Sequence, residues 1–280
     1  MQSASSPPSF LKSKLIYYVL ALVATAFFSF PIVWMSLSSI KSETAIATFP
    51  PVWIFTPTLE SFRLLFLELD ALDALYNSMF IVSIATALAM IAGTLAAYAL
   101  ARFNIKNKNV IAFEVLSIRM LPPIVSVIPL FMIAKQLGVF DTPWLLIAVY
   151  TLNGLPFVVW VMRVFIQEIP QSIEEAALID GCSRFECFWR VTLPLLVPGL
   201  AATMVIIFMF AWNEYLLASI LTSSDARTLP VIAASAIKAK AISWGLASAA
   251  GVLMSLPVVV LVLLMQKYLV RGLTLGAVKG

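Results

Sequence analysis

The sequence of 280 residues contains no histidine and only two cysteines, Cys182 and Cys187. The absence of histidine excludes His-ligated metal sites and histidine general bases. Two cysteines cannot form a structural zinc site by themselves, and they do not suggest a disulfide framework. No metal site is therefore expected in this chain.

Charged residues are also scarce. They make up 11% of the chain, against about 25% in soluble proteins, while 62% of the residues are apolar. The mean hydropathy is +1.01. These values exclude a soluble globular, disordered or fibrous protein and predict an integral membrane protein surrounded by lipid. The net charge of +4 is assigned to loops at a membrane surface, because no basic and aromatic patch indicates nucleic acid binding.

The sequence contains no recognisable catalytic or nucleotide-binding motif. It lacks the phosphate-binding pattern G-x-x-x-x-G-K-[ST], so if ATP drives its activity, another chain must hydrolyse it. Without histidine or a convincing nucleophile–base pair, an intramembrane enzyme is disfavoured, and no selectivity-filter signature indicates a channel. We expect neither catalytic residues nor a bound cofactor.

Six apolar stretches are long enough to cross a hydrocarbon core of ~30 Å as helices. They are expected at residues 15–37, 77–100, 110–134, 143–166, 194–221 and 246–270. The sequence therefore predicts an all-α, polytopic membrane protein with six transmembrane helices.

Prolines are expected to interrupt two of these spans. Pro122, Pro123 and Pro129 should break the third, and Asn153, Gly154 and Pro156 the fourth. The first stretch is interpreted as a retained helix rather than a signal peptide, because its apolar run continues beyond the Ala24-Thr25-Ala26 sequence that resembles a cleavage site.

Lysine and arginine predict the orientation, because they concentrate on the cytoplasmic side. With both termini inside, the inner segments carry eleven of these residues and the outer segments six. The inner ones are Lys12, Lys14, Arg102, Lys106, Lys108, Arg163, Arg184, Arg190, Lys267, Arg271 and Lys279; the outer ones are Lys41, Arg63, Lys135, Arg227, Lys238 and Lys240. Cytoplasmic termini are therefore predicted.

The inner loop between the fourth and fifth spans has a soluble-like composition. Ser172 with Glu175 matches a capping box, and so does Ser183 with Glu186. Gly181 lies between them, where a helix C-terminus favours glycine in the left-handed conformation. The loop is predicted to form two short helices with a bend at Gly181.

Small, large apolar and acidic side chains share this loop. They are Ala176 and Ala177; Leu178, Phe185, Phe188 and Trp189; and Glu174, Glu175 and Asp180, respectively. Small residues permit close backbone approach, the apolar residues need a partner, and the acidic ones would form a rim. Docking of another protein and packing of the loop on its own helix ends both fit this composition.

The loop resembles the EAA motif of ABC importer permeases. That motif reads E-A-A, three residues, G, nine residues, I, any residue, then L-P. The matching residues are Glu175-Ala176-Ala177, Gly181 and Val191-Thr192-Leu193-Pro194, with Val191 in place of Ile. Three other segments resemble the carbohydrate-importing branch, and the chain most resembles the smaller, six-span permease of maltose-type importers. These segments are Pro50-Pro51-Val52-Trp53, Phe210-Ala211-Trp212-Asn213-Glu214 and the C-terminal residues 272–280.

The resemblance implies the type I ABC importer permease fold in the cell inner (plasma) membrane. It divides the chain into a cytoplasmic tail at 1–14, a transmembrane domain at 15–270 with a coupling loop at 167–193, and a cytoplasmic tail at 271–280. The partners would be a second homologous permease, two ATPase subunits that carry ATP and Mg, an extracytoplasmic solute-binding protein and membrane lipid. The tail would reach toward the ATPase dimer interface.

The resemblance also implies which residues dock on an ATPase subunit, and that the cargo is a sugar, an oligosaccharide, a polyol or a sugar derivative. The expected docking residues are Glu174, Glu175, Ala176, Ala177, Asp180, Gly181, Phe185, Leu193 and Pro194.

Polar residues inside spans are candidates for the transport pathway, because each charge there costs roughly 2.5–3.5 kcal/mol. Amides and carboxylates can hydrogen-bond to sugars, and aromatic rings can stack on them. The candidates are Arg119, Asn153, Trp212, Asn213, Glu214 and Tyr215. Ion pairing, interhelical hydrogen bonding and interfacial anchoring are alternative explanations.

An ion-coupled secondary transporter is the alternative function. Such proteins normally use intramembrane carboxylates, and only Glu114 and Glu214 could serve here. No internal repeat is evident.

Overall fold

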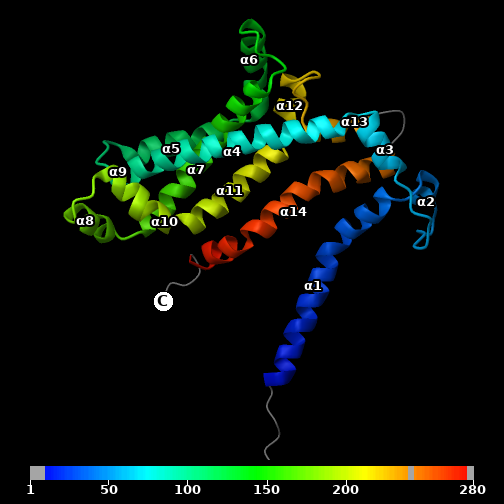
Figure 1. Cartoon of the computed structure of the whole chain (residues 1–280), viewed down its shortest axis with the longest axis horizontal. Coiled ribbons are helices and arrows are strands. Elements are labelled where there is room, and N and C mark those ends of the chain that lie inside the picture. The colour runs from blue at the N-terminus through cyan, green and yellow to red at the C-terminus, as the bar shows by residue number, and fades with distance from the viewer. Residues whose placement is uncertain (1–9, 239–242, 276–280) are drawn as a thin grey trace, which may run out of the picture. The chain divides into compact units, whose positions relative to one another are not determined.

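The computed structural model describes residues 10–238 and 243–275. Every regular element in these ranges is a helix (Figure 1). The chain divides into two compact units. The first comprises Met1–Glu68 with Ala236–Leu253, and the second comprises Leu69–Ser235 with Met254–Gly280.

The first unit contains α1 (Phe10–Ser39), α2 (Glu43–Ala47), α3 (Glu60–Leu67) and the beginning of α14 (Trp244–Leu275). The buried side chain of Lys41 organises the connection after α1. Its ammonium group donates a hydrogen bond of 2.8 Å to a backbone carbonyl of that connection and lies within 5 Å of the rings of two aromatic residues. The cation therefore holds the loop through both a hydrogen bond and cation–π contacts.

The core of the second unit is the packing of α4 (Ala71–Arg102) against α7 (Pro143–Glu168), with α11 (Val197–Trp212) packed on both. Every fourth residue in the middle of α4 is small and buried. These residues are Ala85, Ala89, Gly93, Ala97 and Ala101. Because small residues at this spacing form one flat stripe along a helix, they permit the close helix approach typical of membrane proteins.

The expected break in the third stretch is confirmed at Pro122 and Pro123. The stretch consists of α5 (Lys108–Ser117), a short 3-10 helix η1 (Ile118–Met120) and α6 (Pro123–Gln136), and the segments before and after the break differ in direction by 84°. Proline has no N–H to donate and disfavours a helical residue before it. The expected break at Pro129 is wrong, because this residue lies inside the continuous α6.

The second bend follows the soluble-like loop. The chain passes from α9 (Arg184–Cys187) through a turn of π-helix, η2 (Phe188–Thr192), into α10 (Leu193–Leu195), and turns by 75° into α11. It continues with α12 (Leu216–Leu221) and α13 (Leu229–Lys238). The fifth predicted span is therefore not a single straight helix.

These helices confirm the all-α, polytopic class. By length and composition, four described helices could cross a membrane, or up to six if each bent pair is one span. The expected interruption of the fourth span is wrong, because α7 runs unbroken through Pro156. The exact limits of the spans stay predictions. Residues 1–9 and 276–280 of the two expected tails lie outside the described residues. Lys240, one of the expected outer lysines, also lies outside them.

We expect Gly93→Ala to destabilise the second unit. The added Cβ would lie 2.6 Å from a methyl carbon of Val158 and 2.7 Å from its Cβ, so α4 and α7 would have to separate. Overpacking of this kind costs about 1–3 kcal/mol, which thermal unfolding in detergent would detect. Gly154→Ala is the matched control, because its Cβ would meet no atom closer than 3.4 Å. Equal losses of stability in both variants would contradict this packing.

Asp141 precedes α7 and joins two distant loops of the second unit. It has a φ of 61°, and its carboxylate accepts hydrogen bonds from four successive backbone N–H groups. The donors are Ser223, Ser224, Asp225 and Ala226, at 2.9, 2.9, 3.2 and 3.1 Å. Partial burial raises the pKa of Asp141, but the four donors outweigh it and lower this pKa from 3.8 to about 2.

Because the folded pKa of Asp141 lies below the unfolded one, its contribution to stability is present above about pH 4 and is lost as the pH falls toward about 2. We expect Asp141→Asn to be less stable than the wild type at pH 7 and to lose less stability across that window. Asparagine tolerates the left-handed conformation, so the variant tests the charge rather than the backbone. Parallel pH dependences of the melting temperature would contradict this role.

Candidate functional site

The loop after α7 forms two short helices joined by a sharp bend. The first is α8 (Gln171–Ile179) and the second is α9. Gly181 has a φ of +93°, which confirms the left-handed bend expected there. A side chain would be strained at this position, so the angle between the two helices depends on glycine.

One of the two expected capping boxes exists. Ser183 accepts a hydrogen bond from the backbone N–H of Glu186, whose carboxylate accepts one from the N–H of Ser183. The other, between Ser172 and Glu175, is wrong. Helix α8 begins at Gln171, one residue before the expected capping serine, and has no side-chain cap.

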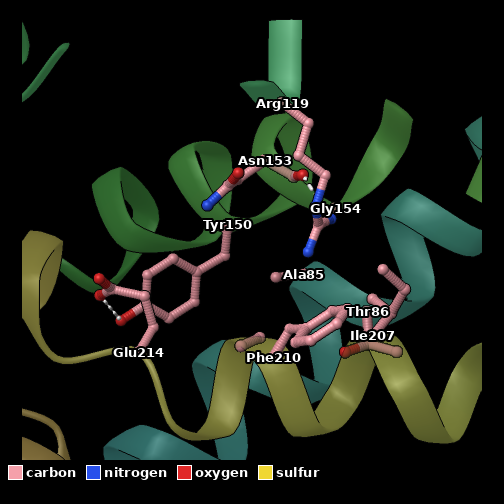
Figure 2. A pocket seen from close by; sticks show the side chains of 10 residues that line it. Ala85, Thr86, Arg119, Tyr150, Asn153, Gly154, Ile207, Phe210 and Glu214 are labelled. Carbon is pink, nitrogen blue, oxygen red and sulfur yellow. Dashed lines mark hydrogen bonds between the residues drawn. The ribbon is translucent and has the colours of Figure 1, made fainter. Parts of the chain in front are cut away.

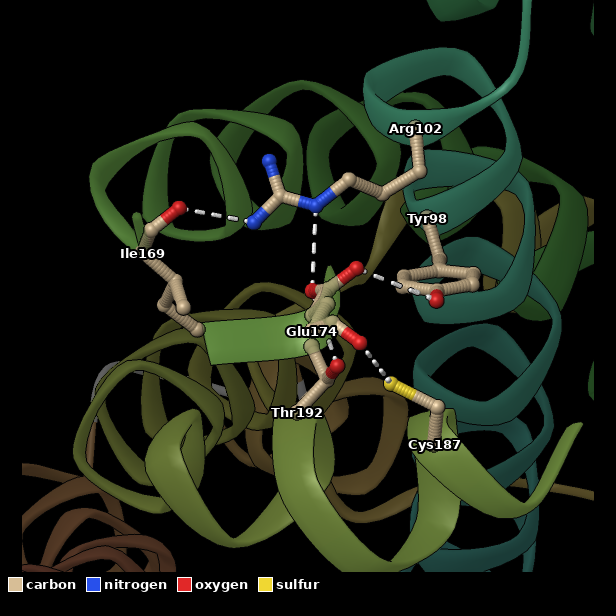
Figure 3. A network of polar contacts seen from close by, with 6 residues as sticks. All are labelled: Tyr98, Arg102, Ile169, Glu174, Cys187 and Thr192. Carbon is tan, nitrogen blue, oxygen red and sulfur yellow. Dashed lines mark hydrogen bonds and ion pairs between the residues drawn. The ribbon is translucent and has the colours of Figure 1, made fainter. Parts of the chain in front are cut away.

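Glu174 holds this loop against the end of α4 (Figure 3). One of its carboxylate oxygens accepts hydrogen bonds from the Nε of Arg102 at 3.0 Å and from the hydroxyl of Thr192 at 2.9 Å. The other accepts one from the hydroxyl of Tyr98 at 3.3 Å. Arg102 also donates to the carbonyl of Ile169 at 2.8 Å. A single carboxylate therefore joins α4, α8 and η2.

The ion pair between Arg102 and Glu174 is buried. The side chains of Arg102 and Glu174 are only 6% and 9% exposed. The thiol of Cys187 adds a weak hydrogen bond of 3.8 Å to the backbone carbonyl of Glu174. The expectation that Glu174 belongs to an exposed acidic rim is wrong. The residue next to the EAA match faces inward and fixes the loop to the helix bundle.

The loop also exposes large apolar side chains. Phe185 is 69% exposed, its ring lies 6.0 Å from that of the exposed Trp189, and Ile179 is also exposed. Phe188 belongs instead to the core, where its ring lies 4.8 Å from that of Tyr98. The composition of the loop put all its large aromatic residues in one group. The structure instead buries Phe188 in the core and leaves Phe185 and Trp189 exposed.

The other expected docking residues lie mostly on the surface of the loop. The exposed ones are Glu175, Ala176, Asp180, Gly181 and Pro194, and the half-buried ones are Ala177 and Leu193. Their position is compatible with docking of another protein.

A second candidate site is a small, partly open hollow between α4, α7 and α11, with a cavity volume of about 30 Å³. Three of the expected pathway residues line it: Arg119, Asn153 and Glu214. Figure 2 shows the side chain of Arg119 extending from η1 toward α11. Its guanidinium carbon lies 5.2 Å from the ring centre of Phe157 and 4.6 Å from that of Phe210, and it donates to the carbonyl of Asn153 at 3.3 Å.

Glu214 lies in the same hollow, but its carboxylate is already engaged. It accepts a hydrogen bond of 3.0 Å from the hydroxyl of Tyr150 and caps α12 through the backbone N–H groups of Leu217 and Ala218, at 2.8 and 3.1 Å. This carboxylate has a structural role at the start of α12 that its position in the sequence did not reveal.

The remaining three pathway candidates do not line the hollow. Trp212 is buried, stacks on Phe208 at 5.7 Å and donates to the carbonyl of Met254 at 3.0 Å. Asn213 donates within its own helix to the carbonyl of Met209 at 2.8 Å. Tyr215 lies at the surface beside α12. In this structure, Trp212 is a core residue of the second unit.

Sequence reasoning missed several residues of the hollow. Tyr150 lies one helical turn before Asn153 and Gly154 on α7, so helical spacing could have identified it. Phe157 and Phe210 look like ordinary lipid-facing residues, and only the fold brings them to Arg119. Thr86 lies on α4 without any motif. Across the two described ranges, no group of three metal-ligating side chains comes together.

Comparisons with known proteins show the family and the fold of the chain. The model of the family described as "Binding-protein-dependent transport system inner membrane component" matches residues 89–275. The chain is 34% identical to the sulfoquinovosyl glycerol transport system permease protein SmoH of Agrobacterium fabrum, over 99% of both chains. It is 35% identical to the trehalose transport system permease protein SugB of Mycobacterium tuberculosis, over 94% of this chain and 96% of that one.

The fold resembles a chain of a bacterial ABC transporter involved in the import of the acidic polysaccharide alginate. The TM-score is 0.72 at 20% identity, over 95% of this chain and 100% of that one. A second structure contains the bacterial alginate ABC transporter in complex with an alginate pentasaccharide-bound periplasmic protein. Its TM-score is 0.66 at 16% identity, over 91% and 94%. At these identities the likeness concerns the fold.

We expect Glu174→Ala to destabilise the protein, because it would leave Arg102 buried without its counter-charge. Breaking a buried ion pair in this way costs about 3–5 kcal/mol. Glu175→Ala is the matched control, because its side chain is exposed. Thermal unfolding of both variants in detergent measures the difference. A Glu174→Ala protein as stable as the control would show that the network does not hold the loop.

Proposed function

Because the chain belongs to the family of inner membrane components of binding-protein-dependent transport systems, we propose that it is the permease subunit of an ATP-driven importer that moves a carbohydrate into the cytoplasm. One observation carries this proposal. The loop that matches the EAA motif is fixed to α4 through Glu174 and exposes apolar side chains such as Phe185. A segment built in this way can receive a partner and transmit its motion.

The structure supports a direct mechanical route from the loop to the hollow. Motion of α8 is passed to α4 through the contact between Glu174 and Arg102. Motion of α9 is passed through η2 and α10 to α11, which follow without a connecting loop. The same helices, α4 and α11, line the hollow with Thr86 and Phe210. Displacement of the loop would therefore change the shape of the hollow.

The subunit would work only with partners. A second homologous permease would complete the pathway, two ATPase subunits carrying ATP and Mg²⁺ would dock on the loop, and a binding protein would deliver the cargo from outside. The many exposed apolar side chains of α1 support contact with lipid or with such a permease. The excess of inner lysine and arginine supports cytoplasmic termini. Catalysis would then belong to the ATPase subunits alone.

The relatives support a carbohydrate as cargo. Their names include sulfoquinovosyl glycerol and trehalose, and the structural neighbours involve alginate. The hollow combines aromatic rings with amide and hydroxyl groups, which is the chemistry that binds sugars. The side chains that line the hollow can therefore contact a sugar or a sugar derivative.

An ion-coupled secondary transporter is less favoured by the same contacts. Glu214 is fully engaged in capping α12, and Glu114 is exposed on α5. Neither forms an obvious site for a coupling ion. Uptake by the purified chain alone, driven by an ion gradient without ATP, would contradict the importer.

We expect Phe185→Ala to weaken binding of the ATPase subunits by about tenfold or more, because a large apolar anchor at an interface typically contributes about 2 kcal/mol. Co-purification from membranes and the ATPase activity of the reconstituted complex measure this loss. Phe27→Ala is the matched control, because Phe27 is 73% exposed on α1, far along the chain from the loop.

Binding of sugar by the separate binding protein should not change in the Phe185→Ala importer. If this variant retained full uptake and normal association with the ATPase, the loop would not be the docking site. A loss of equal size in the control would show that the effect comes from general destabilisation.

A further inference from the structure

Arg119 is an unpaired cation at the centre of the hollow. Within the described ranges of the chain it forms no ion pair, and its one hydrogen bond goes to the carbonyl of Asn153 at 3.3 Å. A guanidinium carries five N–H donors and remains charged under all ordinary conditions. Most of its donors are therefore unused.

The neighbours of Arg119 do not replace an anion. Phe157 and Phe210 stabilise the charge through cation–π contacts, but their rings lack the lone pairs of a strong hydrogen-bond acceptor. The carboxylate of Glu214 lines the same hollow but forms no ion pair with Arg119, and its hydrogen bonds come from Tyr150 and two backbone N–H groups. A charge in a membrane span normally has a counter-charge or a function.

Two further polar groups line the same hollow without a partner. Thr86 is only 2% exposed, and its hydroxyl oxygen forms no hydrogen bond within the described chain. Asn153 also lines the hollow, but it is exposed, and its side-chain amide forms no hydrogen bond within the described chain. Buried polar groups are usually satisfied, so the unpartnered hydroxyl of Thr86 in the same hollow as the unpaired Arg119 indicates a missing ligand.

We propose that Arg119 binds the anionic group of an acidic sugar derivative, with Thr86 and Asn153 hydrogen-bonding to its oxygens. A carboxylate, sulfonate, sulfate or phosphate would accept paired hydrogen bonds from the guanidinium and supply the missing charge. A neutral sugar would leave the guanidinium of Arg119 without an ion-pair partner. This assignment rests on the proposed import of carbohydrates and narrows the cargo to acidic sugars.

The test uses the complete importer in proteoliposomes, with both permeases, the ATPase subunits and the binding protein. The probes are labelled glycosides with a uronate, a sulfonate or a phosphate group, each paired with its neutral parent. We expect ATP-driven uptake of at least one acidic probe in preference to its parent. Arg119→Gln should lower this uptake by about tenfold or more, because a charge-assisted, paired hydrogen bond is lost.

Two variants separate charge from structure. Arg119→Lys keeps the positive charge and should retain part of the uptake, whereas Thr86→Val keeps the shape and should weaken it. Lys106→Gln is the control for removal of a cation, because Lys106 is exposed on the connection after α4. Its uptake should equal that of the wild type. All variants should co-purify with the second permease.

Three results would overturn the assignment. The first is ATP-driven uptake of the neutral parent sugars alone, a result that would still agree with the proposed function as an importer. The second is an equal loss of neutral and acidic uptake in Arg119→Gln. The third is loss of the second permease from Arg119→Gln on co-purification, which would place Arg119 at a subunit contact. Absence of ATP-driven uptake for every sugar would instead contradict the proposed function itself.

Discussion

The buried ion pair between Glu174 and Arg102 is the contact on which the functional part of the structure depends. It joins the end of a core helix to a loop that would otherwise be held only by chain connectivity and a few apolar side chains. Taking two charges out of water is costly, and here the neighbouring hydroxyls and a backbone carbonyl satisfy both groups. The hydrogen bonds of Glu174 and Arg102 therefore fix the loop to the end of α4.

Close packing of α4 and α7 provides the stiff base that this connection needs. The stripe of small residues on α4 lets the two helices approach closely, so Val158 contacts the helix at Gly93 without a gap. The bent segments on either side have a different role. The break before α6 leaves Arg119 at η1, from where its side chain lines the hollow.

Arg119 lies at the break in the third apolar stretch and also lines the hollow. The proline pair ends the preceding helix at η1 and leaves the arginine at the break, where its side chain reaches between α7 and α11. Two phenyl rings stabilise the cation, and Glu214 lines the same hollow without forming an ion pair with it. The hollow therefore contains a positive charge beside α7 and α11.

The sequence by itself determined the membrane class, the approximate positions of the helices, the bend at Gly181 and the membership in a family, because hydropathy, proline, glycine and motif spacing act locally. Only the tertiary structure decided that Glu174 faces inward while Phe185 faces outward, that Trp212 belongs to the core, and that Glu214 accepts a hydrogen bond from Tyr150. These assignments depend on contacts between residues up to 76 positions apart in the chain, such as Tyr98 and Glu174. No local pattern encodes the direction in which such a side chain points.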